Sequence, residues 1–200
     1  MKLIYSVPSP YARKARITLI EARLEGRVEI EALDPWSDPP GFRNDNPLGK
    51  VPVLIRDDAP ALFQSNIVCE YLNAEGGAQL YPDDGPRRWT ALRQLALADG
   101  ILDASVTVRM ELTFHEPGKM SQKLVERQEL SVARAVSALE NEAETLDGPV
   151  TIGQIAVACA LGYRDFRFAD VDWRRAHPKL AGWFATFAER ASMTATDPTA

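Results

Sequence analysis

Cysteine and histidine are scarce in this sequence, and their spacing excludes two common ways of stabilising a small fold. The 200 residues include two cysteines, Cys69 and Cys159, and two histidines, His115 and His177. The cysteines lie far apart, and neither belongs to a Cys-x-x-Cys pair. Structural zinc sites and secreted disulfide scaffolds both need more ligands or cysteines at closer spacing. The sequence therefore predicts neither a metal centre nor a disulfide framework.

Long hydrophobic runs and an excess of positive charge are also missing. No apolar run approaches the ~20 residues that a membrane-spanning helix needs, and Met1–Ile4 leads directly into polar and proline residues rather than a signal-peptide core. The formal net charge is -5, whereas nucleic-acid-binding domains usually carry a basic stripe. The one basic stretch, Arg13, Lys14 and Arg16, is short and is interpreted as a solvated helix face. We expect a cytoplasmic protein that binds neither nucleic acid nor membrane.

The N-terminal part carries alternating strand and helix patterns. Hydrophobic residues make up 46% of the chain, which is enough for a sizeable core. Period-two alternation and turn-forming residues predict short strands, and apolar spacing of three to four predicts helices. The predicted strands are 2–5, 28–33, 51–55 and 61–63, and the predicted helices are 10–24 and 64–74, with one short helix in the proline-rich loop 34–49. The order is β-α-β-(α)-β-β-α.

Strand signals disappear after a segment rich in glycine and proline. Apolar residues then recur at helical spacing in two long stretches, with a break near residues 116–118. Residues 155–161 are apolar on all sides and indicate a buried helix. A final helix is expected at 178–191, and the tail after Met193 is expected to be loose. The predicted parts are an α/β domain at 1–76, a linker at 77–86 and an all-helical domain at 87–200.

Ser9 precedes Pro10 at the turn from the first strand into the first helix. Serine is a common helix N-cap and proline suits the first helical position, so capping alone explains the pair. A helix N-terminus also presents free N–H groups and a partial positive charge, which stabilise a thiolate. The Ser9 hydroxyl can donate a hydrogen bond to such a thiolate. Both roles remain open at this point.

Two further positions have features that suit a ligand. Pro52 opens a predicted strand, where it removes a ladder donor. Either a cis peptide that exposes the Val51 backbone to an extended peptide ligand, or a trans proline on an edge strand, explains it. Gln64 and Ser65 begin the helix at 64–74. A helix N-terminus with a free hydroxyl suits a carboxylate, although capping by Ser65 explains the pair equally well.

Three segments, with their order and spacing, form a more specific pattern. They are Ser9-Pro10-Tyr11-x-Arg13-Lys14, Asn46-Pro47-Leu48-Gly49-Lys50-Val51-Pro52-Val53-Leu54 and Gln64-Ser65-Asn66-Ile67-x-x-x-Tyr71-Leu72. Followed by an all-helical half, they resemble the glutathione transferase family, most closely its small bacterial members. The resemblance covers residues 1–190. It implies an N-terminal thioredoxin-like domain that binds glutathione and an all-helical C-terminal domain of the same family type.

The resemblance also implies a role for each motif residue. Ser9 would face the glutathione sulfur as the catalytic residue. The rest of glutathione would be held by the Val51 backbone beside a cis Pro52 at the cysteinyl part, by Gln64 and Ser65 at the γ-glutamyl group, and by Lys50 at the glycyl carboxylate. Tyr5 and Tyr11 lie near the same site, and either could replace Ser9 as the thiolate partner.

Gln64 departs from the family pattern, because many relatives carry Glu or Asp there. The charge partner of the glutathione amine is then missing. Asp99 is a candidate for it, either beside the site or from a partner subunit, since it lies among apolar positions of the first long helical stretch. A structural ion pair of Asp99 with Arg93 or Arg109 is the alternative. Thr151 and Gln154 begin the buried helix as a capping box that ends in Gln instead of the family's Asp.

For function, the resemblance implies a homodimeric glutathione transferase in detoxification. It would bind glutathione as co-substrate, need no metal, and direct the thiolate at a small hydrophobic electrophile or a peroxide. Serine at position 9 disfavours the mixed-disulfide chemistry of relatives with cysteine there. A glutathione-dependent isomerase or dehalogenase, or a non-catalytic binding protein of the same fold, are the alternatives. Residues that could line a second-substrate pocket, or simply be core, are Arg109, Met110, Phe114, Tyr163 and Phe166.

Overall fold

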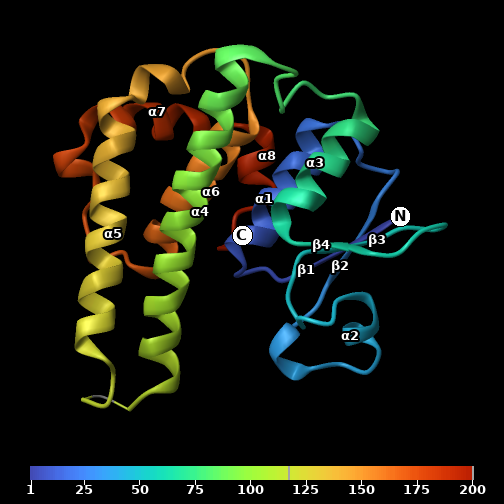
Figure 1. Cartoon of the computed structure of the whole chain (residues 1–200), viewed down its shortest axis with the longest axis horizontal. Coiled ribbons are helices and arrows are strands. Elements are labelled where there is room, and N and C mark those ends of the chain that lie inside the picture. Colours follow the sequence, from blue (N-terminus) through green and yellow to red (C-terminus); the bar gives the residue numbers. More distant parts are fainter. Residues whose placement is uncertain (117, 200) are drawn as a thin grey trace. The chain divides into compact units, whose positions relative to one another are not determined.

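The chain folds into two compact units (Figure 1). The structure is a computed structural model that describes residues 1–116 and 118–199. The first unit spans Met1–Asp83 and also includes the C-terminal segment from Ala191, and the second spans Asp84–Arg190. The sequence-based scheme assigned all of 87–200 to the helical part, whereas here the last residues pack with the first unit. Pro117, inside the predicted break, lies outside the described residues.

The first unit is built on a mixed four-stranded sheet with the order β2-β1-β3-β4. The strands are β1 (Lys2–Tyr5), β2 (Glu29–Ala32), β3 (Val53–Ile55) and β4 (Leu62–Phe63). β1 is parallel to β2 and antiparallel to β3, and β3 is antiparallel to β4. The predicted order β-α-β-(α)-β-β-α is confirmed, with each strand after the first shorter than the sequence pattern indicated.

Helices lie on both faces of this sheet (Figure 1). On one face, α1 (Pro10–Glu21) packs against α3 (Ser65–Gly76). On the other lies the short helix α2 (Phe42–Asp45), whose Phe42 packs with Ile4 and Val53; the turn η1 (Pro35–Ser37) precedes it. Because side chains alternate along a strand, the neighbouring Leu3 and Leu54 are buried on the opposite face.

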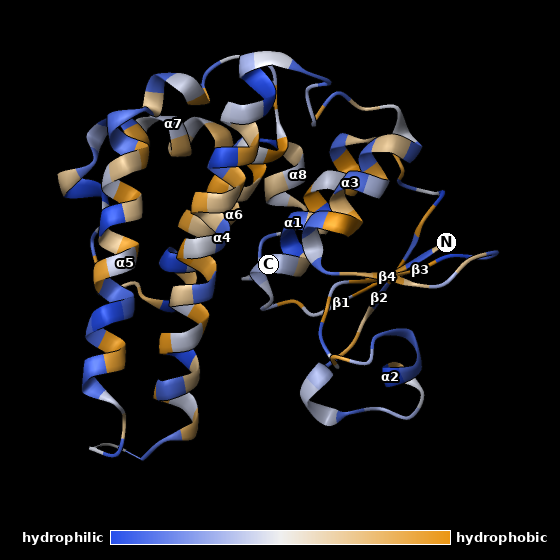
Figure 2. Cartoon of the chain, in the orientation of Figure 1, coloured by the Kyte–Doolittle hydropathy of each residue, from blue (hydrophilic) through white to orange (hydrophobic). Residues whose placement is uncertain are grey.

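Helices joined by loops are the only regular secondary structure of the second unit among the residues that the structure describes in 84–190. Its helices are α4 (Gly85–Phe114), α5 (Gln122–Asn141), η2 (Ala143–Leu146), α6 (Ile152–Arg167), η3 (Arg174–Ala176) and α7 (Pro178–Ala188). The long helix α4 packs against both α5 and α6. Figure 2 shows the contrast between α5, which alternates polar and apolar residues, and the more apolar α6. None of the helices within the described residues is both long and apolar enough to cross a membrane.

The helix α6 is the buried helix that the apolar run predicted. Residues 152–161 are buried throughout. Gly153 allows its close approach to α4, because a Cβ there would lie 2.6 Å from the carbonyl oxygen of Ala91. The predicted capping box is present: the Thr151 N–H donates to Gln154 Oε1 at 2.6 Å. A glutamine can therefore complete this box.

The C-terminal segment corrects the expectation of a loose tail. It forms the short helix α8 (Ala191–Thr194), in which Met193 is 3% exposed. Arg13 and Arg16 on α1 donate to the carbonyl oxygens of Met193 and Ala195, each at 3.1 Å. Carbonyl groups at a helix C-terminus lack partners within the helix and carry partial negative charge, so arginines stabilise them. No local sequence pattern indicates this contact, because the partners lie about 180 residues apart.

Candidate functional site

Ser9 is the N-cap of α1, and its hydroxyl has room for a second partner. Its Oγ accepts a hydrogen bond from the Ala12 N–H at 3.2 Å, and its own N–H donates to the Ser6 carbonyl oxygen at 3.0 Å. The residue is partly exposed. A hydroxyl that accepts one bond through a lone pair still has its O–H to donate. Capping and contact with a thiolate, the two roles that the sequence left open, are therefore compatible.

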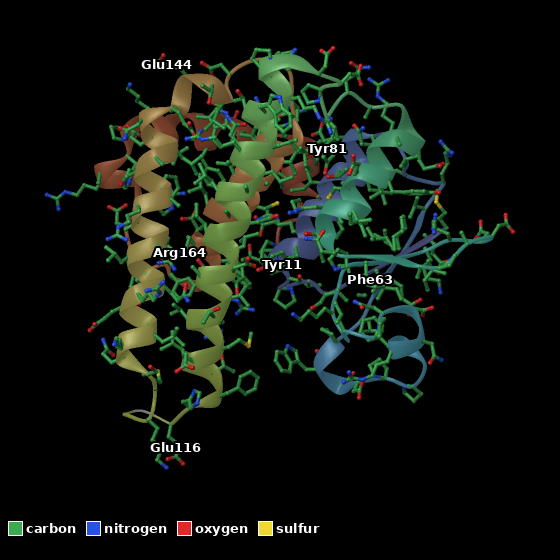
Figure 3. All side chains as sticks on the ribbon, viewed as in Figure 1. Tyr11, Phe63, Tyr81, Glu116, Glu144 and Arg164 are labelled. Carbon is green, nitrogen blue, oxygen red and sulfur yellow. The ribbon has the colours of Figure 1, made fainter. Side chains whose placement is uncertain are left out.

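The two tyrosines near Ser9 differ in their surroundings. The ring of Tyr5, at the end of β1, lies 4.4 Å from the guanidinium carbon of Arg16, a cation–π contact. Burial lowers the pKa of that Arg16 guanidinium below its usual range. Tyr11 lies on the first turn of α1, partly buried (Figure 3). Of the three hydroxyl-bearing residues, Ser9 alone occupies the helix cap, where the N–H groups converge.

The peptide between Val51 and Pro52 is cis, which is the first of the two interpretations that the sequence allowed. The loop before it is shaped by Asn46, which is 1% exposed. Its Nδ2 donates to the Lys50 carbonyl oxygen at 2.7 Å and its Oδ1 accepts from the Leu48 N–H at 3.0 Å. Within 1–116 and 118–199, no group hydrogen-bonds to the Val51 backbone. This backbone is available to an added strand, and the Lys50 side chain beside it is exposed.

Gln64, and not Ser65, caps α3. Its backbone has φ +70, a value uncommon for residues other than glycine. In this conformation its Oε1 accepts from the N–H groups of Asn66 at 2.8 Å and Ile67 at 3.3 Å. The sequence does not predict this arrangement, because serine is a usual capping residue and glutamine is not.

Ser65 is thereby left with unused hydrogen-bonding groups. It is the first helical residue and is 5% exposed. Neither its hydroxyl nor its backbone N–H has a hydrogen-bond partner among the residues that the structure describes. A hydroxyl and an N–H that have no partner among the described residues, at the N-terminus of a helix, suit an anionic ligand.

Lys14 is the residue of this region that sequence reasoning missed. The sequence pattern predicts that the basic stretch is a solvated helix face, yet Lys14 is fully buried and Arg13 is 8% exposed. The Lys14 Nζ donates at 2.6 Å to the Oδ1 of Asn66, which is the residue directly after Ser65 in the sequence. The Tyr81 hydroxyl donates to the Asn66 carbonyl oxygen at 3.3 Å. Helical periodicity gives one hint, because Lys14 is four residues before the buried Thr18.

The remaining candidates lie in the helical unit. Asp99 is partly buried on α4. Arg93, one of the two arginines considered as its structural partner, pairs with Glu142. Tyr163 on α6 is 6% exposed, and this burial raises its pKa, an effect that nearby Arg167 and Arg109 oppose.

The other proposed lining residues are more exposed than Tyr163. Phe114, at the end of α4, is 60% exposed, and Arg109, Met110 and Phe166 are partly buried. Nearby on α5 and α6, Arg164 is almost fully buried and forms a bidentate pair with Glu129 at 3.0 and 2.8 Å (Figure 3). This pair ties α5 to α6 and belongs to the core of the unit.

Comparison with known proteins agrees with the arrangement. Residues 8–75 match the model of the glutathione S-transferase N-terminal domain, and residues 122–186 match that of its C-terminal domain. The uncharacterized GST-like protein YibF of Escherichia coli (strain K12) is 33% identical, with 99% of this chain and 98% of YibF covered.

Solved structures extend the similarity to the whole fold. A glutathione transferase family member from Pseudomonas fluorescens Pf-5, with bound glutathione, is 42% identical with a TM-score of 0.93, and 98% of each chain is covered. A glutathione S-transferase from Methylobacillus flagellatus KT, also with glutathione bound, is 34% identical with a TM-score of 0.88 over 98% of each chain. The predicted fold, a thioredoxin-like domain followed by an all-helical domain, is confirmed.

Proposed function

The chain belongs to the glutathione S-transferase family, and on that premise we propose that it is an enzyme that binds glutathione and directs its thiolate at an electrophile or a peroxide. Two homologous structures at 34% and 42% identity contain bound glutathione. The observation that carries the proposal for this chain is Ser65 at the start of α3, whose hydroxyl and N–H lack partners among the described residues.

In the proposed complex, residues at the start of α3 and in the loop before β3 hold the tripeptide. The γ-glutamyl carboxylate accepts from the N–H and hydroxyl of Ser65, where the helix macrodipole also favours negative charge. The cysteinyl part pairs with the Val51 backbone beside Pro52, as an added strand pairs with a sheet edge. Lys50 approaches the glycyl carboxylate from the exposed side of the same loop. Gln64, whose side chain is exposed, contacts the γ-glutamyl group and orients it.

Ser9 would then stabilise the glutathione thiolate. Its O–H donates to the sulfur while its oxygen keeps the N-cap bond to α1. The free N–H groups of the first turn of α1 add a favourable field for the anion, which lowers the pKa of the bound thiol. Catalysis in this scheme consists of thiolate stabilisation and positioning, without a covalent intermediate on the enzyme.

Other parts of the proposal depend on the family resemblance alone. Asp99 would meet the glutathione amine, whose partner at position 64 is neutral here. The helical unit would contact the second substrate, a small hydrophobic electrophile, through aromatic side chains such as Phe114 and Tyr163. We further propose a cytoplasmic homodimer with a role in detoxification and no requirement for a metal.

The test is glutathione binding by calorimetry on the wild type and on Ser65→Ala. Hydrogen bonds to charged groups contribute about 1.5–3 kcal/mol, so the substitution should weaken binding by roughly tenfold or more. Ser131→Ala is the matched control, because Ser131 is an exposed serine on α5 that bonds within its own helix. It should leave binding unchanged.

Absence of glutathione binding by folded wild-type protein would contradict the proposal. The non-catalytic binding protein of the same fold would then be the better interpretation, and the search would turn to protein partners. Binding by the wild type that Ser65→Ala leaves unchanged would show that the carboxylate is held elsewhere.

A further inference from the structure

A group of cationic side chains surrounds a buried phenol within the helical unit. Arg109 lies on α4, and Tyr163 and Arg167 lie four residues apart on the same face of α6. Helix α4 packs against α6 (Figure 1). Burial raises the pKa of Tyr163, and the charges of the nearby Arg167 and Arg109 oppose this rise. The three residues therefore form one cationic cluster.

The two arginines of the cationic cluster have no carboxylate partner within residues 1–116 and 118–199. The carboxylates closest to them in the sequence of α5 and α6 are used by other groups. Glu129 pairs with Arg164. Asp165 pairs with Arg174 and accepts a hydrogen bond from the Trp173 indole. The cluster thus keeps positive charge that no described side chain neutralises.

Arg167 is held by stacking and not by an acceptor for all of its N–H groups. Its guanidinium carbon lies 4.1 Å from the centre of the Phe166 ring, a cation–π contact. Its Nε is buried without a hydrogen-bond partner among the described residues, whereas most buried polar atoms in proteins have one. A stacked guanidinium still presents in-plane N–H groups that match a carboxylate. Arg167 and Arg109 are both partly exposed, so a ligand can reach them.

A structural role explains only part of this arrangement. The last turn of α6 carries partial negative charge and favours a cation, which suits both Arg164 and Arg167. Arg164 is buried and bidentate to Glu129, as expected of an arginine that holds helices together (Figure 3). Arg109 lies before the last turn of α4, so the macrodipole does not account for it. Two like charges near one phenol repel each other, and a bound anion relieves that repulsion.

We propose that the cationic cluster binds a carboxylate of the second substrate: the guanidinium groups of Arg109 and Arg167 hold its oxygens, and the Tyr163 hydroxyl donates a further hydrogen bond. The inference rests on the proposed function, which assigns the second substrate to the helical unit. It narrows that substrate to an electrophile whose apolar body carries a carboxylate. The net charge of the chain is -5, so the attraction for such a substrate is local to the cluster.

The experiment compares an acidic electrophile with its neutral amide. 4-Chloro-3-nitrobenzoate and 4-chloro-3-nitrobenzamide share the same ring and leaving group. In both reactions the glutathione sulfur bonds to the ring carbon that carries chlorine, the C–Cl bond breaks, chloride leaves with the electron pair, and the thiol proton passes to solvent. Because the two rings differ in intrinsic reactivity, each variant is compared with the wild type on the same electrophile.

Arg167→Met and Arg109→Met each remove one charge and keep an unbranched stem. Each should lower kcat/KM for the acid by about tenfold or more, mainly through KM, and leave kcat/KM for the amide within about twofold. Arg167→Lys keeps the charge without the planar fork and should retain part of the preference for the acid. Arg134→Met, at an exposed arginine on α5, is the matched control and should change neither value. Thermal unfolding verifies that each variant is folded.

The difference between the two electrophiles separates this role from a structural one. Equal losses for acid and amide in Arg167→Met and Arg109→Met would overturn the inference and leave the proposed function intact. Unchanged kcat/KM for the acid in both folded variants would overturn it as well.

A pair of unreactive ligands separates the inference from the proposed function. 3-Nitrobenzoate and 3-nitrobenzamide have no leaving group, and calorimetric titration without glutathione measures the cluster alone. Binding of the acid that Arg167→Met weakens would support the carboxylate site even if the wild type fails to bind glutathione, a failure that overturns the proposed function. Wild-type protein that does not prefer the acid over the amide in this titration would overturn the inference.

Discussion

At the scale of single residues, the Ser9 hydroxyl combines a structural bond with a free donor. Ser9→Ala removes both. A hydrogen bond to a charged group contributes about 1.5–3 kcal/mol, so kcat with an electrophilic substrate should fall by roughly 10- to 150-fold. Loss of the N-cap should also lower the free energy of unfolding by about 1 kcal/mol. Steady-state kinetics and chemical denaturation measure the two effects separately.

Glutathione binding provides the contrast for Ser9. The hydroxyl is proposed to contact the sulfur and not the two carboxylates, so Ser9→Ala should weaken glutathione binding much less than it lowers kcat. Ser9→Thr keeps a hydroxyl that can cap the helix and donate, and it serves as the control. Equal losses in kcat and in binding by Ser9→Ala would rule out the catalytic assignment and point to Tyr5 or Tyr11.

At the scale of elements, the C-terminal segment is held to α1 by side chains of α1. Arg13 is 8% exposed, and it bonds the Met193 carbonyl oxygen and the Thr196 hydroxyl. Arg13→Ala removes these two bonds and the packing of the arginine stem, and leaves the Met193 carbonyl oxygen with the Thr196 hydroxyl as its donor at 3.3 Å. Hydrogen bonds that involve a charged group contribute about 1.5–3 kcal/mol, so the free energy of unfolding should fall by at least about 1 kcal/mol.

A matched substitution separates this effect from the loss of any arginine. Arg134 is exposed on α5, and Arg134→Ala should change the free energy of unfolding by less than about 0.5 kcal/mol. Chemical denaturation of both variants gives the comparison, and hydrogen exchange of the α1 amides locates the change. Equal free energies of unfolding for Arg13→Ala and Arg134→Ala would contradict the prediction, because they would show that the contacts of Arg13 with the C-terminal segment do not stabilise the fold.

At the scale of the whole molecule, we predict a homodimer. The prediction comes from the family resemblance and from the polar interruptions in the apolar pattern of α4. Several large apolar side chains are exposed in the single chain, among them Leu48, Ile67 and Trp89. Sedimentation at micromolar concentration should give a species of about twice the chain mass of 22.1 kDa. A single species near the mass of one chain, unchanged with concentration, would contradict the prediction.

The sequence by itself determined the features that depend on neighbours along the chain. Strand alternation, helical spacing and the proline-rich loops gave the element order. The Ser9-Pro10 start of α1 and the capping box of α6 were predicted because a cap bonds groups within three residues of itself. The motif around Val51 also allowed the cis peptide that the structure has.

Only the tertiary structure decided the features whose partners are distant in sequence. Lys14 is buried because Asn66, 52 residues away, accepts its hydrogen bond. The C-terminal segment is ordered because Arg13 is presented to Met193 across 180 residues. Gln64 caps α3 because the chain enters the helix at positive φ from a neighbouring strand. A local pattern cannot encode such partners, since a buried charge or carbonyl is tolerated only where the folded chain brings a matching group to it.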